Sequence, residues 1–96
     1  MTARHSKIII RSLKKFGFVK LEEKNHHQYY VHVTHGGEVL RVRTYISHGN
    51  KDYGDDLLSK VADQIKLTKK ELLNLIDGNM TRKEYEDILR SKGFIK

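Results

Sequence analysis

Residues 28–47 read QYYVHVTHGGEVLRVRTYIS, and this stretch decides the fold class. Its two halves, 28–34 and 39–47, place successive side chains alternately on a more apolar and a more polar side of an extended chain. Such alternation is typical of β-strands that bury one face. Between the two halves, Gly36 and Gly37 predict a hairpin turn, because glycine permits positive φ at both central positions.

The alternation assigns the side chains of both strands to faces. On the second strand, one face carries Leu40, Val42, Thr44 and Ile46, and the other carries Arg41, Arg43 and Tyr45. On the first strand, one face carries Tyr29, Val31 and Val33, and the other carries Gln28, Tyr30, His32 and Thr34. With a further short strand at 18–22, we expect a three-stranded antiparallel sheet with one apolar face and one face of arginine, tyrosine and histidine. Because neighbouring side chains on a strand point to opposite faces, either Tyr29 or Tyr30 must face the core. The other tyrosine, together with Tyr45, could then stack on the bases of a nucleic acid.

A helix is expected before the sheet. Its apolar residues Ile9, Leu13 and Phe16 recur at helical spacing and predict a helix over residues 4–16. Gly17 follows at the position where a left-handed C-terminal cap is usual. The chain then enters the first strand at once.

After the sheet, residues 48–56 predict a polar loop that leaves Tyr53 exposed. A helix then begins at Asp55 or Asp56, where acidic side chains complement the helix dipole. The order of one helix, three strands and one helix predicts an α+β fold in which the helices form a layer on the sheet.

Two further helices are predicted by their N-terminal residues. Thr68 with Glu71, and Thr81 with Glu84, have the spacing of a capping box and predict short helices over about 69–77 and 82–92. We therefore expect one domain over residues 1–96, with a core at about 4–66 and a helical C-terminal extension at about 67–96.

The composition excludes several classes of protein. The chain has no cysteine, which rules out disulfides, thiolate zinc sites and a cysteine nucleophile. The longest apolar run, Ile8-Ile9-Ile10, is far shorter than the roughly 18 residues that a membrane span requires. The N-terminus lacks the apolar core of a signal peptide. We expect a cytoplasmic protein with no membrane contact and no small-molecule cofactor.

The charge of the chain is positive and unevenly distributed. The net charge is +7 at pH 7, and the sequence pI is about 9.7. Residues 1–50 carry nine Lys and Arg against three acids, a net of +6, and residues 51–96 carry ten against nine, a net of +1. Lysine and arginine release counterions from phosphates, so the N-terminal half is the expected phosphate-binding surface. The alternative is that the charge only aids solubility.

The six histidines invite two chemical hypotheses. A metal site would need histidines at a fixed spacing together with carboxylates, and the adjacent pair His26-His27 and the pair His32 and His35 do not provide it. We therefore expect no metal. Imidazole also acts as a general acid or base near neutral pH. His26 or His27, beside Lys24 and near Arg41, Arg43 and Lys51 in the expected fold, would supply an acid–base group and cations for RNA cleavage. The alternative is that both histidines only contact solvent.

Three short segments together resemble one family. The first resembles a helix that ends in a Lys-Gly-Phe-like turn, and it reads Leu13-Lys14-Lys15-Phe16-Gly17-Phe18. The second resembles a strand that opens with a Gly-Ser-His motif, and it reads Lys24-Asn25-His26-His27-Gln28-Tyr29. The third resembles a strand that ends in histidine before a loop containing glycine and lysine, and it reads Ser47-His48-Gly49-Asn50-Lys51. In this order the segments resemble the HicA toxins of bacterial and archaeal toxin–antitoxin systems, over residues 6–66. Lys24 and Asn25 stand where that family has Gly and Ser.

The resemblance implies both a fold and an activity. The implied fold is that of a double-stranded-RNA-binding domain, and the implied activity is metal-independent cleavage of mRNA by the toxin of a type II system. A HicB-like antitoxin is the implied protein partner. The family's catalytic histidine falls on His26, and its strand-end histidine falls on His48. We expect Lys24, Asn25, His27, Arg41, Arg43, His48 and Lys51 to contact RNA.

Two other functions fit the same residues. A non-catalytic RNA-binding domain of similar fold would use the basic surface and the tyrosines without any histidine, and the replacement of Gly-Ser by Lys24-Asn25 favours it. A protein-binding subunit would use the sheet face or the helices for a partner. The third function is compatible with the first, because a toxin of this kind is held in a complex.

Overall fold

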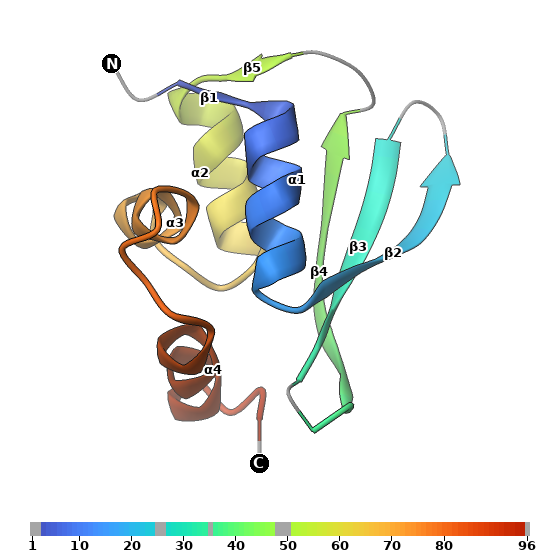
Figure 1. Ribbon diagram of the computed structural model, residues 1–96, viewed down its shortest axis with the longest axis vertical. Helices are drawn as coiled ribbons and strands as arrows, with labels where there is room; N and C mark the ends of the chain where they lie inside the picture. Colours follow the sequence, from blue (N-terminus) through green and yellow to red (C-terminus); the bar gives the residue numbers. More distant parts are fainter. Residues whose placement is uncertain (1–2, 25–26, 35, 48–50, 96) are drawn as a thin grey trace.

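The computed structural model describes residues 3–24, 27–34, 36–47 and 51–95 (Figure 1). The expected α+β fold with a three-stranded antiparallel sheet is confirmed. The elements follow one another as β1 (Arg4–His5), α1 (Ser6–Lys15), β2 (Phe18–Lys24), β3 (His27–Val33), β4 (Val39–Ser47), β5 (Asp52–Tyr53), α2 (Asp55–Gln64), α3 (Lys69–Ile76) and α4 (Arg82–Ser91).

The three long strands form a meander in the order β2-β3-β4, so that β3 is central and the other two are edge strands. Two irregularities interrupt the pairing, one between Lys20 and Glu22 and one between Val31 and Val33. A second, two-stranded sheet pairs β1 with β5 through Arg4 and Tyr53. The sequence predicted no strand at either place, because two residues are too short to show an alternation.

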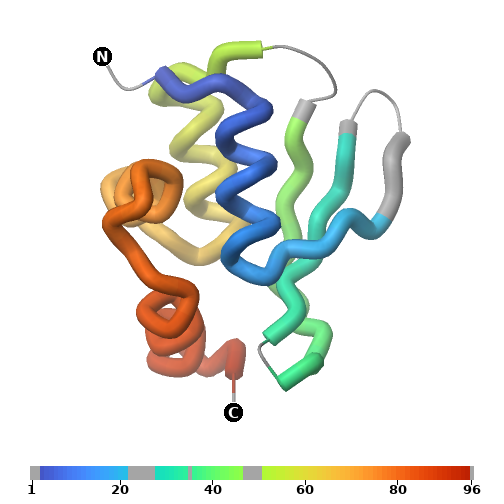
Figure 2. Tube along the Cα trace, in the orientation of Figure 1, coloured from blue at the N-terminus to red at the C-terminus, as the bar shows by residue number. Residues whose placement is uncertain are grey.

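The helices lie together on one side of the three-stranded sheet (Figure 1). α1 packs against β2 and β4, and α2 packs against β4. α3 packs against both α1 and α2. The tube in Figure 2 shows how closely α1 is followed by β2, with only a short reversal of the chain between them. The opposite side of the sheet carries no helix.

One hydrophobic cluster joins the sheet to all four helices. Its fully buried members are drawn from α1, β3, β4, α2, α3 and α4, and they include Ile9, Leu13, Tyr30, Val42, Ile46, Leu58, Leu72, Leu75, Tyr85 and Leu89. Tyr85 of α4 contacts Phe16, Phe18 and His32, and its hydroxyl donates to the Ile65 carbonyl oxygen at 2.9 Å. The C-terminal helices therefore complete the core.

The side chains of β3 face the opposite way from the expectation. Tyr30 and His32 are buried beneath the helices, whereas Tyr29 pairs with Tyr45 on the face without helices. The prediction of a histidine-bearing polar face is therefore wrong at His32. The physical reason is that Tyr30 and His32 both find polar partners inside: the Tyr30 hydroxyl donates to Gln28 Oε1 at 2.7 Å, and His32 Nε2 lies 3.0 Å from the Phe16 carbonyl oxygen.

His32 is a fully buried imidazole in this fold. Its side chain is 0% exposed, and its ring lies between Phe18 and Tyr85 at centroid distances of 5.1 and 5.4 Å. Burial lowers the pKa of the His32 imidazole below its ordinary value, and the Glu86 carboxylate at 3.9 Å offsets only part of that effect. With Nε2 donating to the Phe16 carbonyl oxygen, Nδ1 is left without a partner among the described residues.

The turn at Gly17 fixes the path from α1 into β2. Gly17 has a φ of +94°, which confirms the predicted left-handed position after the helix. Its carbonyl oxygen accepts from the Val33 amide at 2.8 Å, and Arg82 Nη2 donates to the Val33 carbonyl oxygen at 2.8 Å. A Cβ at Gly17 would lie within 3 Å of both Arg82 Nη2 and the Val33 oxygen. This close approach ties α4 to the sheet.

The sequence also predicted two capping boxes, a hairpin turn and an exposed Tyr53. Both capping boxes are formed, with the Thr68 and Thr81 side chains accepting from the Glu71 and Glu84 amides. The hairpin turn predicted at Gly36 and Gly37 is confirmed between β3 and β4, and Gly37 has a positive φ of +91°. In this hairpin the Gly37 amide donates to the Thr34 carbonyl oxygen at 2.9 Å, and this hydrogen bond closes the turn. Tyr53, predicted to be exposed, is buried because β5 pairs with β1 over the start of α2.

Candidate nucleic-acid interface

The backbone brings the described residues of two predicted segments, 24–29 and 47–51, to one end of the sheet. Lys24 at the end of β2 pairs with His27 at the start of β3, and His27 pairs with Ser47 at the end of β4. The predicted residues Asn25, His26 and His48 lie outside the described residues. The described residues next to them in the chain, Lys24, His27 and Ser47, form one row across the three strands, as expected if these segments share one site.

The backbone of Lys51 is held by the first residue of α1. The Ser6 amide donates to the Lys51 carbonyl oxygen at 2.8 Å, and the Lys51 amide donates to Ser6 Oγ at 3.3 Å. Ser6 is fully buried, whereas the Lys51 side chain is exposed. The start of α1 therefore holds the backbone of a predicted phosphate-binding residue.

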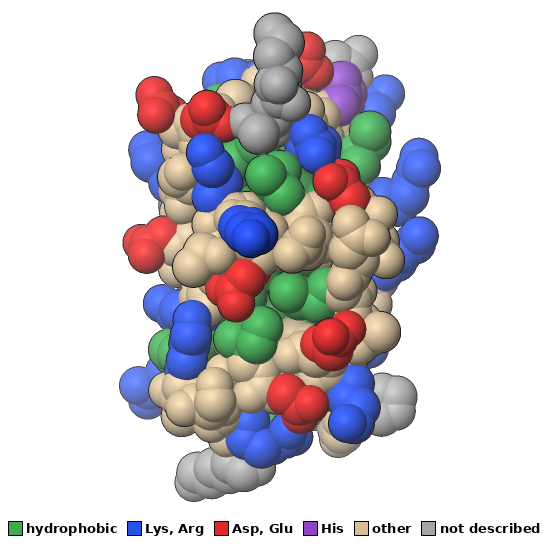
Figure 3. Space-filling view, turned by 90° about the vertical axis from the view of Figure 1, so that its left-hand side faces the viewer, with side chains coloured by type: hydrophobic (Ala, Val, Ile, Leu, Met, Phe, Trp, Pro, Cys, Tyr) green, Lys and Arg blue, Asp and Glu red, His purple; other side chains and the backbone are tan. Residues whose placement is uncertain are grey.

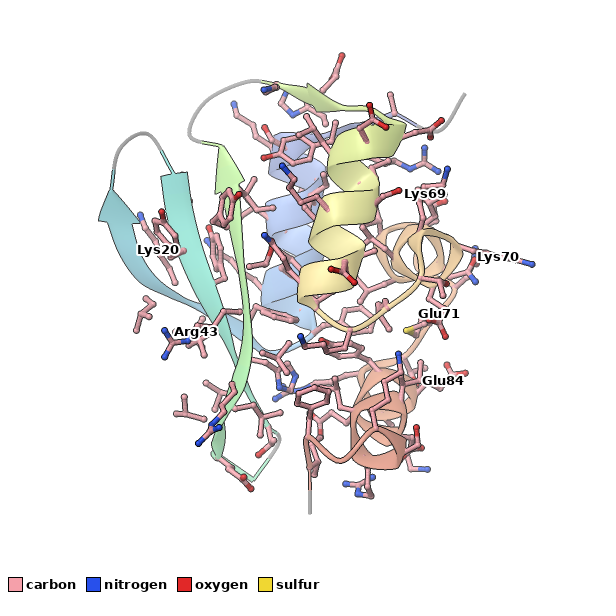
Figure 4. The ribbon with its side chains drawn as sticks, turned by 180° about the vertical axis from the view of Figure 1, so that it is seen from behind. Lys20, Arg43, Lys69, Lys70, Glu71 and Glu84 are labelled. Carbon is pink, nitrogen blue, oxygen red and sulfur yellow. The ribbon has the colours of Figure 1, made fainter. Side chains whose placement is uncertain are left out.

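The face of the sheet without helices carries the predicted arginines. Arg41 and Arg43 are exposed on β4, and Arg43 pairs with Val31 of β3. One step along the same face, the rings of Tyr29 and Tyr45 lie with their centroids 5.6 Å apart at an interplanar angle of 42°. Figure 4 shows Arg43 at the sheet, on the opposite side of the molecule from Lys69 and Lys70.

Aliphatic side chains are exposed on the strands of this sheet. Val19 and Leu21 of β2 are 53% and 54% exposed, and Val39 of β4 is 66% exposed. By its pairing with Val31, Val19 lies on the same face as Arg43. The uncovered face therefore mixes apolar contact area with cations and aromatic rings, which is a composition suited to binding a large partner.

The cations of the N-terminal half have few acidic partners. Four exposed basic side chains lie along α1: Lys7, Arg11, Lys14 and Lys15. Within residues 3–24, 27–34, 36–47 and 51–95, neither these four nor Arg41, Arg43 and Lys51 form an ion pair. The positive charges of these seven side chains are consequently available to an anionic ligand.

The C-terminal half is different. Four of its cations pair with carboxylates: Lys69 with Asp55, Arg82 with Glu86, and Lys83 and Arg90 with Asp87. Asp77 at the end of α3 is paired with Arg4 in a bidentate contact, at 3.0 and 2.8 Å. The space-filling view of the side where α3 lies shows acidic and basic side chains interspersed (Figure 3). This side is therefore not a phosphate-binding surface.

A cavity of about 180 Å³ opens between β4, β5 and α2. It is lined by Tyr45, Lys51, Tyr53, Leu57, Lys60, Val61 and Gln64. Sequence reasoning missed Lys60 and Gln64. Their spacing with Leu57, at three and four residues, puts all three on one face of α2, and this was the signal that could have found them.

The histidines divide into structural residues and candidates for chemistry. His5 caps α1, where its Nδ1 accepts from the Lys7 amide at 3.1 Å, and His32 is buried in the core. Neither faces the exposed side of the sheet. Within the described part of the chain, no three potential ligands come together to hold a metal ion.

Comparison of this chain with protein-family models, with curated proteins and with solved structures gives no match. None of the helices in the described ranges is long and apolar enough to cross a membrane. The features that bear on function are therefore the cations without an ion pair among the described residues and the partly exposed pair Tyr29 and Tyr45.

Proposed function

We propose that this protein is an endoribonuclease of the HicA type, a toxin that binds and cleaves mRNA without a metal ion. The observation that carries the proposal is the set of cations on α1 and β4 that form no ion pair in the described part of the chain, together with the Tyr29–Tyr45 pair. The order α1-β2-β3-β4-α2, with the helices on one side of the sheet, is also the order that the resemblance implies.

RNA binding follows from charge and aromatic surface. Each lysine or arginine that contacts a phosphate releases counterions, so affinity rises as salt is lowered. Exposed aromatic rings stack on unpaired bases with little sequence preference. Arg41, Arg43 and Lys51 supply the phosphate contacts in this proposal, and Tyr29 and Tyr45 supply the stacking surface. Lys24, Asn25, His27 and His48 add further RNA contacts in this proposal.

The proposed cleavage uses imidazole chemistry. His26 acts as the acid–base group: an imidazole removes the proton of a 2′-hydroxyl, whose oxygen attacks the adjacent phosphorus, and an imidazolium returns a proton to the leaving 5′ oxygen. The neighbouring cations stabilise the negative charge that develops on the phosphate oxygens. The products are a 2′,3′-cyclic phosphate and a free 5′-hydroxyl, and no metal ion takes part in the step.

A protein partner belongs to the same proposal. An active ribonuclease of this kind needs restraint in the cell, and a HicB-like antitoxin covering the cationic surface would provide it. The exposed Val19, Leu21 and Val39 would supply apolar contacts in such a complex. The partner would compete with RNA for Arg41 and Arg43.

The second candidate function is RNA binding without cleavage. Lys24 and Asn25 favour it, because they replace the small residues Gly and Ser that precede the histidine in the resembling family. Both functions require the same cationic surface. They differ only in the need for His26.

RNA cleavage by matched histidine variants separates these functions. Total RNA is incubated with wild type, His26→Ala and His35→Ala, the last carrying the same change at a histidine with no proposed role, in the presence of a chelator. Cleavage by wild type and His35→Ala but not by His26→Ala supports the ribonuclease. Binding without cleavage between pH 5 and 9, the range in which imidazole titrates, supports the second function. Equal cleavage by His26→Ala would contradict the role of this residue.

A further inference from the structure

We infer that the cavity between β4, β5 and α2 is a subsite for one unpaired nucleotide, with the base against Tyr45 and Tyr53 and the phosphate on Lys51 and Lys60. This inference rests on the proposed binding of RNA and adds the place where a single nucleotide is held. Neither Lys60 nor Gln64 was among the residues that the sequence suggested.

The size of the cavity restricts its ligand. Pockets that enclose drug-sized ligands measure roughly 300–1,000 Å³. The volume here is about 180 Å³, which is too small for such a molecule or for a helical segment. A single aromatic ring with an attached charged group is the class of ligand that a space of this size accepts. A nucleobase with its phosphate is such a ligand.

The lining of the cavity is chemically suited to a nucleotide. Two tyrosines provide aromatic surface, and Leu57 and Val61 provide aliphatic surface for the faces of a ring. Gln64 provides an amide: its Oε1 accepts from the Thr44 hydroxyl at 2.6 Å, which leaves the amide nitrogen as a donor for a base oxygen or ring nitrogen. Thr44 is buried, so this hydrogen bond fixes the position of Gln64.

The two lysines give the cavity its preference for an anion. Lys51 and Lys60 are both exposed, and neither forms an ion pair in the described part of the chain. Lys51 is anchored by its backbone hydrogen bonds with Ser6, whereas Lys60 projects from the middle of α2. Two ammonium groups around one opening favour a phosphate over an uncharged or cationic ligand.

The cavity is continuous with the cationic face of the sheet through Tyr45. The same ring lines the cavity and pairs with Tyr29 on the uncovered face. Arg43 lies two residues away along β4, a separation of about 7 Å in a strand. Successive phosphates of one RNA strand could therefore contact Arg43 on the sheet and the lysines at the cavity.

The test compares substitutions in the cavity with the same substitution elsewhere. Lys60→Gln and Tyr45→Leu are compared with Lys70→Gln, which removes an equally exposed lysine from α3, far from the cavity (Figure 4). Affinity for a fluorescently labelled single-stranded RNA oligonucleotide is measured by anisotropy at several salt concentrations. Lys60→Gln should weaken binding three- to tenfold and reduce the slope of log K against log salt by about one. Tyr45→Leu should weaken binding about tenfold, and Lys70→Gln should bind like wild type.

A second measurement locates the ligand without relying on RNA cleavage. In an NMR titration with uridine 5′-monophosphate, the amide signals of residues 45, 51, 53, 60 and 64 should shift, and those of α3 should not. Inorganic phosphate at the same concentration should shift only the signals near the lysines. If phosphate reproduces the shifts at Tyr45 and Tyr53, the base is not held there and the inference is overturned.

The outcomes separate this inference from the proposed function. Wild type that binds neither the oligonucleotide nor the mononucleotide contradicts both. RNA binding that is unchanged in Lys60→Gln and Tyr45→Leu overturns the subsite and leaves the proposed function standing. Loss of cleavage in His26→Ala with an intact mononucleotide titration supports both. Thermal unfolding of each variant confirms that it is folded.

Discussion

The Ser6 amide donates to the carbonyl oxygen of Lys51 at 2.8 Å, and the Lys51 amide donates back to the Ser6 hydroxyl at 3.3 Å. This reciprocal pair joins the first residue of α1 to the residue just before β5, 45 positions later in the chain. It fixes the backbone of a lysine that lines the cavity. The stability of the fold and the position of this cation are thereby linked at a single buried serine.

Ser6→Ala should cost about 1 kcal/mol of unfolding free energy, because it removes a buried hydrogen bond to the Lys51 amide but keeps the backbone bond. Urea denaturation measures the change. Ser59→Ala, at an exposed position of α2, is the control and should change the free energy by less than about 0.5 kcal/mol. Equal stability of the two variants would show that the serine hydroxyl contributes nothing.

Gly17→Ala should destabilise the protein by about 2–3 kcal/mol, because alanine is strained at positive φ and its Cβ would displace Arg82 from the Val33 carbonyl oxygen. The midpoint of urea unfolding measures the loss. Gly36→Ala is the matched control, because a Cβ there meets only Thr34 Oγ1 at 3.9 Å. A loss of the same size at both glycines would refute the close contact at Gly17.

The free energy of unfolding should decrease as the pH falls below about 6.5, the ordinary pKa of the imidazole. The folded protein keeps His32 neutral because burial lowers its pKa, whereas the unfolded chain takes up a proton at that pH. The unfolded state then binds more protons, so acid favours unfolding, and the contribution is fully present only above the ordinary pKa. Urea titrations between pH 5 and 8 measure this slope.

The control for His32 is a variant without the ionisable ring. His32→Gln should be less stable than wild type at pH 8, since it disturbs the hydrogen bond to the Phe16 carbonyl oxygen. It should also have a shallower dependence of stability on pH. A slope that is unchanged in this variant would assign the pH dependence to other groups.

Arg43→Gln should weaken binding of single-stranded RNA by a similar factor for different sequences and reduce the salt slope by about one, as expected for a phosphate contact. Arg90→Gln on α4 is the control, because Arg90 is paired with Asp87 on the side of the sheet that carries the helices. Anisotropy titrations at several salt concentrations give both quantities. An effect confined to one RNA sequence would instead indicate that Arg43 contacts a base.

The sequence predicted well those elements whose signals are local. The bounds of β4 agree with the prediction, and the capping boxes at Thr68 and Thr81 start α3 and α4 where expected. Gly17 adopts the predicted left-handed conformation. In each case the determining residues lie within a few positions of one another, so the chain's own alternation or spacing contains the information.

The features that were missed depend on distant parts of the chain. Which face of β3 is buried depends on the partners that His32 finds in α1 and α4, and alternation alone cannot choose between two mixed faces. The burial of Tyr53 depends on β1, which follows the N-terminus. Lys60 and Gln64 look like ordinary surface positions of a helix until β4 and β5 are placed opposite them.

Tyr85 has a consequence for spectroscopy. The chain contains five tyrosines and no tryptophan, so phenol rings dominate its near-ultraviolet absorbance and its fluorescence. Burial, aided by the charge of Glu86, raises the pKa of the Tyr85 phenol, and its hydroxyl is already bound to the Ile65 carbonyl oxygen. In an alkaline titration this ring should ionise only when α4 leaves the core. The absorbance of its phenolate is therefore an intrinsic optical reporter of helix undocking, available without any attached dye.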